Sequence, residues 1–138
     1  MIREIMSYIE RQETAGGLRI KSIEGRAELK DEKVVLRATK KIVKSEQFLL
    51  YDNTFSADGK ISNEHRHLFH LKLKEDVAKD EEIHIWTKSG KYETELNNGL
   101  NRHHYFWGLR TKVWNSDNNE TVHLVHVSHI ATKKFPGD

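Results

Sequence analysis

Histidine is the residue type whose number and spacing in this chain most suggest chemistry. The 138 residues contain nine histidines and no cysteine, so a transition-metal site would need imidazole and carboxylate ligands. Most of the histidines form three groups along the sequence: His65, His67 and His70; His103 and His104; and His123, His126 and His129.

Strand geometry argues against a metal held within either triple. Successive side chains of a strand point to opposite faces, so His65 and His67 share a face that His70 opposes. By the same rule, His126 opposes the two outer members of its group. Nearby carboxylates do not recur at ligand spacing. We therefore expect structural or surface histidines, no metal and no other cofactor, with a site formed between strands as the alternative.

Patterns of catalysis are weak in the sequence. Ser89 lacks the preceding Gly-x of a nucleophile elbow, and no glycine-rich phosphate loop is present. The acidic run Asp80-Glu81-Glu82 is typical of a solvated turn before a strand. No pair of carboxylates stands out for glycoside hydrolysis. We expect no catalytic residues, with a hydrolase of unknown substrate as an alternative.

Positive charge gathers in the second half of the chain. Between residues 88 and 112 there are five Lys or Arg residues, interrupted by Glu93 and Glu95. They flank two loops that a β-sandwich can bring to one end, where they would contact phosphates weakly. An ordinary solvated hairpin is the alternative. Together with a tryptophan considered next, the candidate binding residues are Lys88, Lys91, Arg102, His104, Arg110, Lys112 and Trp114.

The three tryptophans allow two interpretations. Large aromatic side chains on predicted strands usually pack in a core, so we expect Trp86 and Trp107 to be buried. Trp114 begins a turn-rich segment and has no such assignment. An exposed indole there would stack on a sugar or a base, which both offer a flat face.

The elements that must position these residues begin with a predicted helix. Ile2, Ile5, Met6 and Ile9 form one apolar stripe at helical spacing. Because the pair Gly16-Gly17 would stop such a helix, we assign residues 1–17 to an N-terminal helical segment.

From Leu18 onward the pattern has a period of two. Short runs of alternating residues, about ten residues apart, are separated by Gly, Asn, Asp and Ser. This rhythm favours an all-β fold over alternating βα units. The expected strands cover residues 19–23, 33–39, 47–51, 67–73, 82–87, 91–96, 103–107 and 121–129, and Asp58-Gly59 is an expected tight turn. We assign residues 18–138 to one β-sandwich domain.

Composition limits the class of protein. Lys and Arg number 23 against 21 Asp and Glu, giving a net charge of +2, so the chain as a whole is no polycation. No apolar run approaches the ~18 residues of a membrane span. The first thirteen residues carry acids throughout and do not resemble a signal peptide. We expect a soluble, cytoplasmic protein that does not bind membranes.

Residues 68–125 resemble the lamin-tail domain in the form common in bacteria. The similarity lies in a series of short motifs: LFHLKL at 68–73, EIHIWTKSG at 82–90, YFWG at 105–108, VWNSDN at 113–118 and ETVHLV at 120–125. The chain departs from the family pattern at 79–81 and 119–120, both turns that tolerate Asn and Asp. The resemblance implies an immunoglobulin-like β-sandwich with a binding or accessory role and no catalytic residues.

The expected function is therefore that of a non-catalytic binding module. Its loops would engage a protein or, weakly and without sequence preference, a nucleic acid. The first alternative is a small-ligand or metal-binding protein that uses Trp114 and the histidines.

Overall fold

The computed structural model describes residues 5, 12–52, 54–55, 61–62, 67–114 and 121–137. These residues form an all-β fold, which confirms the predicted fold class at this level. Among them, no helix has the length and apolar character needed to cross a bilayer. The strands are β1 (Thr14–Ala15), β2 (Leu18–Glu24), β3 (Lys33–Ala38), β4 (Gln47–Asp52), β5 (Thr54–Phe55), β6 (Ile61–Ser62), β7 (Leu68–Lys72), β8 (Glu82–Trp86), β9 (Glu93–Asn97), β10 (Leu100–Phe106) and β11 (Val122–Val127).

Each strand expected from the period-two pattern is present, and its ends differ from the expected ones by a few residues. The pattern succeeded because one face of most of these strands packs in the core and the other does not. The expected turn at Asp58-Gly59 lies outside the described residues.

The structure differs from the predicted N-terminal helix at the C-terminal end of that segment. Residues 1–11, apart from Ile5, lie outside the described part of the chain, so most of the predicted helix is not tested. Gly16 and Gly17 do not stop a helix: they join β1 to β2, with Ala15 paired to Leu18. Both glycines have positive φ, +56° and +90°. Such a pair suits a two-residue hairpin turn, which is why the chain forms a strand here.

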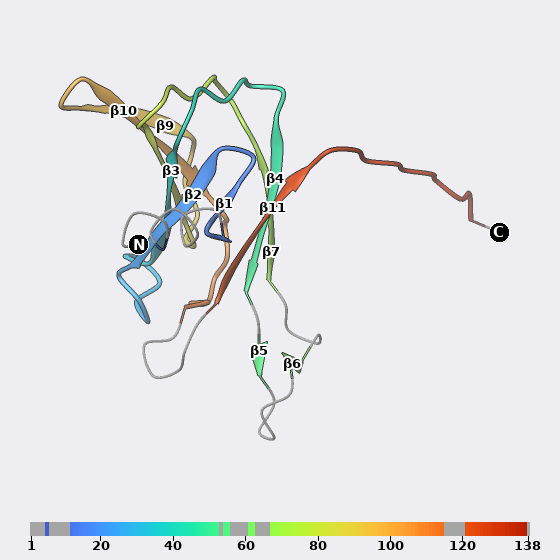
Figure 1. Ribbon diagram of the computed structural model, residues 1–138. Helices are drawn as coiled ribbons and strands as arrows, with labels where there is room; N and C mark the ends of the chain where they lie inside the picture. Colours follow the sequence, from blue (N-terminus) through green and yellow to red (C-terminus); the bar gives the residue numbers. More distant parts are fainter. Residues whose placement is uncertain are drawn as a thin grey trace.

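The strands form two main sheets. The larger has the order β1-β2-β3-β8-β10-β9 and the smaller β11-β4-β7, while β5 pairs with β6. Neighbouring strands are antiparallel, except that β8 and β10 run parallel. Figure 1 shows the β9–β10 hairpin projecting from one side of the body and the residues after β11 projecting from the other.

One hydrophobic core lies between the two sheets. Leu36, Ile83 and Ile85 from the larger sheet join Phe48 and Leu50 from the smaller in a single buried cluster. This packing is consistent with a β-sandwich. The side chains that alternate with Ile83 and Ile85 along β8 point to the opposite face of the larger sheet, where the candidate site lies.

The loop between β2 and β3 depends on Gly25. Its φ is +63°, and a β-carbon there would lie 2.2 Å from the carbonyl oxygen of Asp31. The loop holds that oxygen in place, because the Asp31 amide donates to the Glu28 carbonyl at 3.0 Å and the Glu28 amide donates to the Gly25 carbonyl at 3.3 Å. Only glycine allows this compact loop, which ends at Glu32.

We predict that Gly25→Ala lowers the free energy of unfolding by about 3 kcal/mol or more, because left-handed strain adds to a clash with backbone. Gly99→Ala is the control, since Gly99 has φ +80° but nothing within 4 Å of the added carbon. It should cost only about 1–2 kcal/mol. Urea unfolding of both variants measures the difference, and equal losses would show that the loop relaxes.

Candidate binding surface

The two basic loops lie side by side, because the pairing of β8 with β10 continues past the ends of both strands. The Trp107 amide donates to the Trp86 carbonyl at 2.7 Å, and the Leu109 amide donates to the Thr87 carbonyl at 2.9 Å. Between them, the Gly108 amide donates to the Lys88 carbonyl at 3.1 Å. The structure thus brings residues 86–88 and 107–110 to one end of the larger sheet.

Trp86 lies on the outer face of this sheet and is partly exposed, so its predicted place in the core is wrong. It alternates with the core residue Ile85 and pairs in register with Lys33 and Phe106 on the neighbouring strands. The Phe106 ring stacks beside the indole at a centroid distance of 6.3 Å. The ammonium groups of Lys33 and Lys88 lie 4.4 Å and 4.6 Å from the indole centroid, within cation–π range.

A chain of hydrogen bonds orients the indole. Its Nε1–H donates to Nδ1 of His104 at 2.9 Å, and Nε2 of His104 lies 3.0 Å from Oε1 of Glu95. Because Nδ1 accepts, the proton of a neutral His104 sits on Nε2 and is donated to Glu95. The hydrogen bond from His104 holds the pKa of Glu95 below its ordinary value. His104 therefore fixes the position of Trp86.

Two predicted binding residues are engaged within this face. His104 is buried, so it has little surface to offer a ligand. The Arg102 guanidinium lies 3.7 Å from Glu82 and 3.7 Å from Glu95. Arg102 and His104 point to the same face as Glu82, because residues of even number along β8 and β10 share it, and Glu95 on β9 pairs in register with Arg102. The charge of Arg102 is therefore largely balanced locally.

The other predicted cations differ from Arg102, which lies beside two glutamates. Within the described part of the chain, no carboxylate forms an ion pair with Lys88, Lys91, Arg110 or Lys112. Lys91, Arg110 and Lys112 are exposed, and Lys88 is partly exposed. Lys33 is likewise partly exposed and forms no ion pair with a carboxylate of the described residues. We call Lys33, Trp86, Lys88, Lys91, Arg110 and Lys112 the Trp86 surface.

Trp114 is buried, which overturns its predicted role as an open ring for stacking. Its side chain is 0% exposed and belongs to the core cluster. The neighbouring backbone is held by Glu32, whose carboxylate accepts from the amides of Val113 at 2.6 Å and Trp114 at 3.3 Å. Trp107, which was expected in the core, is partly buried and packs against it.

The described histidines are distributed over the structure. His67 lies 3.3 Å from Asp52, His70 2.7 Å from Gln47, and His126 2.7 Å from Glu46, measured between side-chain atoms. His65 is outside the described residues. In the part of the chain that is described, no three His, Asp or Glu side chains are placed to hold a metal ion.

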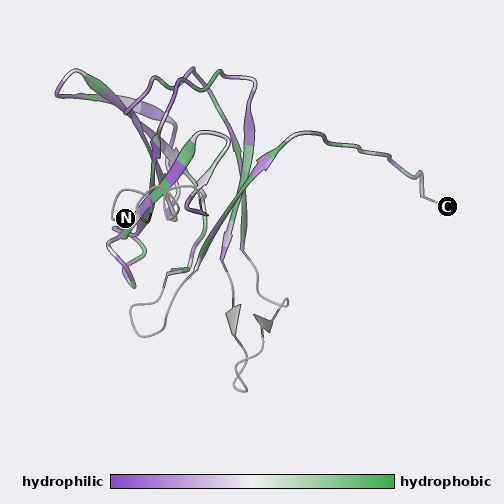
Figure 2. Ribbon diagram, viewed as in Figure 1, coloured by the Kyte–Doolittle hydropathy of each residue, from purple (hydrophilic) through white to green (hydrophobic). Residues whose placement is uncertain are grey.

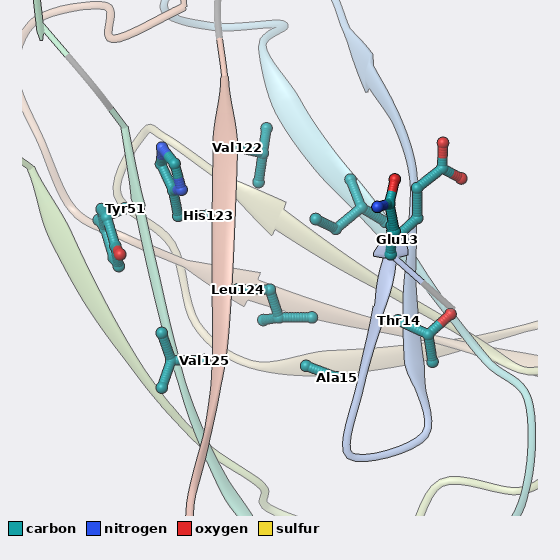
Figure 3. A pocket seen from close by; sticks show the side chains of 10 residues that line it. Glu13, Thr14, Ala15, Tyr51, Val122, His123, Leu124 and Val125 are labelled. Atoms are coloured by element: carbon teal, nitrogen blue, oxygen red, sulfur yellow. The ribbon is translucent and has the colours of Figure 1, made fainter. Parts of the chain in front are cut away.

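One of the pockets lined by a histidine contains His123. It has a volume of about 190 Å³ and lies between β1 and β11. Figure 3 shows Tyr51 and His123 on one side of β11 and Glu13 and Thr14 on the other. The rings of Tyr51 and His123 stack at 4.7 Å. Trp114, the other residue of the small-ligand alternative, does not line this pocket.

A buried acidic network was missed by the sequence analysis. Glu81, expected in a solvated turn, is buried, and its Oε1 lies 2.9 Å from Nε2 of His103, whose Nδ1 lies 3.1 Å from the Tyr92 hydroxyl. Burial alone would raise the pKa of Glu81, but hydrogen bonds from His103 and from two backbone amides outweigh it and lower that pKa. Burial and nearby groups raise the pKa of Tyr92, so this phenol keeps its proton and is a poor nucleophile.

Comparison with models of known protein families gives no match, and comparison with curated proteins gives none either. The candidate surface therefore rests on the residues and their geometry.

We predict that Glu32→Gln lowers the free energy of unfolding by about 2–3 kcal/mol, because an amide nitrogen replaces one acceptor of a buried backbone N–H. Glu28→Gln is the control, since Glu28 is an exposed residue of the same loop. It should change stability by no more than about 0.5 kcal/mol. Urea unfolding compares the two, and a neutral Glu32→Gln variant would show that the carboxylate is not needed.

His84 should make stability depend on pH. It is buried beside Glu82, and burial is the main cause of a pKa below the ordinary value of 6.5. The unfolded chain therefore takes up a proton near pH 6.5 while the folded chain resists it, so stability is present above this pH and is lost as pH falls below it.

The measurement is the free energy of unfolding at pH 7.5 and pH 5.5. His84→Gln should lose less stability between these pH values than the original protein. His70→Gln, at an exposed position, should keep the original loss. If His84→Gln is as sensitive to acid as the original protein, His84 is not the source.

Proposed function

We propose that this protein is a non-catalytic binding module whose Trp86 surface binds single-stranded nucleic acid weakly and without sequence preference. The observation that carries the proposal is a partly exposed indole with two lysine ammonium groups within 4.6 Å of its centroid. Exposed Lys91, Arg110 and Lys112 add positive charge on the chain segments that follow β8 and β10.

The chemistry of the surface suits a flexible polyanion. An exposed base stacks on an aromatic side chain with about 1–3 kcal/mol per base, while cations at its edge neutralise phosphates. The long lysine side chains can leave the ring to contact the backbone of the strand. Because the net charge of the chain is only +2, binding should be weak, with a Kd of ~10⁻⁴–10⁻⁶ M that rises steeply with salt.

We also propose that the fold is the immunoglobulin-like sandwich of the lamin-tail domain. In support, the segments that resemble this domain form β7, β8, the end of β10 and most of β11, and these strands occur in both sheets. A helix over residues 1–15 stays a prediction from the sequence for the residues outside the described part.

The test is fluorescence anisotropy of a labelled oligothymidine at 50 mM and 200 mM salt, with a labelled duplex beside it. We expect saturable binding of the single strand at low salt and much weaker binding at high salt, because counterion release drives it. The quadruple variant Lys88→Ala, Lys91→Ala, Arg110→Ala and Lys112→Ala should abolish binding. Trp86→Ala should weaken single-strand binding by about tenfold, from the loss of stacking.

The matched control removes four other exposed lysines, through Lys30→Ala, Lys44→Ala, Lys72→Ala and Lys79→Ala. It has the same net charge as the first quadruple variant, so retained binding would locate the site. Equal loss of binding in both variants would show that binding depends on overall charge alone. No binding of either probe at 50 mM salt would contradict the proposal and favour a protein partner.

A further inference from the structure

Two arms of the protein expose apolar side chains on opposite sides of the body. Every residue from 128 to 137 is exposed, including Ile130 at 59% and Phe135 at 75%. This tail leaves the end of β11 and runs outward, away from the rest of the chain (Figure 1). Figure 2 shows hydrophobic stretches along it. Large exposed apolar side chains on an extended segment suggest that this segment contacts a binding partner.

The second arm is the β9–β10 hairpin, which projects on the side opposite to the tail (Figure 1). β9 is the outermost strand of the larger sheet. It carries Leu96, 73% exposed, and Leu100 at the start of β10 is 39% exposed. The outer edge of such a strand offers backbone N–H and C=O groups that another strand can pair with.

The other strands at the edges of the two sheets have contacts with other parts of the chain at or near their edges. β1 and β11 lie close together, since the His126 ring on β11 would be 2.5 Å from a β-carbon at Gly16. Just beyond β7, the Lys74 amide already donates to the Tyr105 hydroxyl at 3.0 Å. Among the described strands, β9 is therefore the edge best suited to accept an added strand.

The tail and β9 are complementary in charge and in pattern. The tail carries Lys133 and Lys134, and β9 carries exposed Glu93 and, beside Arg102 and His104, exposed Glu95. Successive residues of a strand point to opposite faces, so Lys134 and Phe135 diverge just as Glu95 and Leu96 do. One register therefore places Lys134 on the face of the glutamates and Phe135 on the face of Leu96.

We propose that residues 128–137 of one copy add as a strand to the β9 edge of a second copy. Because the two arms project on opposite sides, a molecule cannot satisfy its own edge with its own tail. The contact joins two different surfaces, so repeated pairing produces open chains or a closed ring. Backbone hydrogen bonds supply affinity, and the Lys–Glu and apolar contacts fix the register.

The experiment is sedimentation velocity of the full chain over about 10 µM to 1 mM, the range in which a small interface is populated. We expect a mass that rises beyond that of a dimer with concentration. Leu96→Asp and the double variant Ile130→Asp, Phe135→Asp should each raise the dissociation constant by about tenfold or more. Both should keep the original thermal stability, because the changed side chains are exposed.

Mixing these two variants gives the decisive result. The Leu96→Asp chain has an intact tail and the double variant has an intact β9, so the mixture should form a one-to-one dimer and nothing larger. Leu68→Asp, at an exposed leucine on β7, should leave assembly unchanged. A protein that stays monomeric at 1 mM, a mixture without dimers, or assembly blocked by Leu68→Asp would each overturn the proposal.

Discussion

The carboxylate of Glu32 is the interaction on which the candidate surface depends most. It is fully buried and accepts from the amides of Val113 and Trp114, while the Glu32 carbonyl accepts from the Thr87 amide at 3.3 Å. A buried charge is tolerated only when hydrogen bonds replace its water. These bonds tie the β2–β3 loop, the end of β8 and the segment after β10 to one point. They thereby fix the path of the chain after β10, which carries Arg110 and Lys112.

The alternation of β8 then separates packing from binding. Ile83 and Ile85 fill the core, while Glu82, His84 and Trp86 form the outer face. At the start of β8, cations and carboxylates balance one another, because Lys21 and Arg102 lie beside Glu82 and Arg102 also lies 3.7 Å from Glu95. At the end of the strand, the charged groups that contact the Trp86 ring in the described part of the chain are the ammonium groups of Lys33 and Lys88. The charges on this face are thus balanced at the start of β8, and positive charge remains at its end.

The sequence predicted the positions of the strands well but predicted the burial of single residues less well. Period-two alternation depends on near neighbours, which explains the agreement of strand positions. The burial of Glu32 and Glu81 depends on partners 81 and 22 residues away, which no local pattern reveals. The two indoles were predicted wrongly for different reasons. Trp86 has the parity of Glu82 and His84, a sign of the outer face that was available, whereas the burial of Trp114 required knowing that Glu32 holds its backbone.

Head-to-tail assembly would let several weakly binding Trp86 surfaces act on one nucleic-acid strand. A single Trp86 surface offers one indole and a handful of cations, which limits what one copy can hold. Copies joined through tail and hairpin would present several such surfaces along one polyanion. Each further contact is then intramolecular, and avidity can exceed the affinity of one site by about 10²–10⁴ without any new kind of contact. The gain requires that successive surfaces face the same strand, so the geometry of the tail–β9 contact would decide whether assembly strengthens binding or merely links copies.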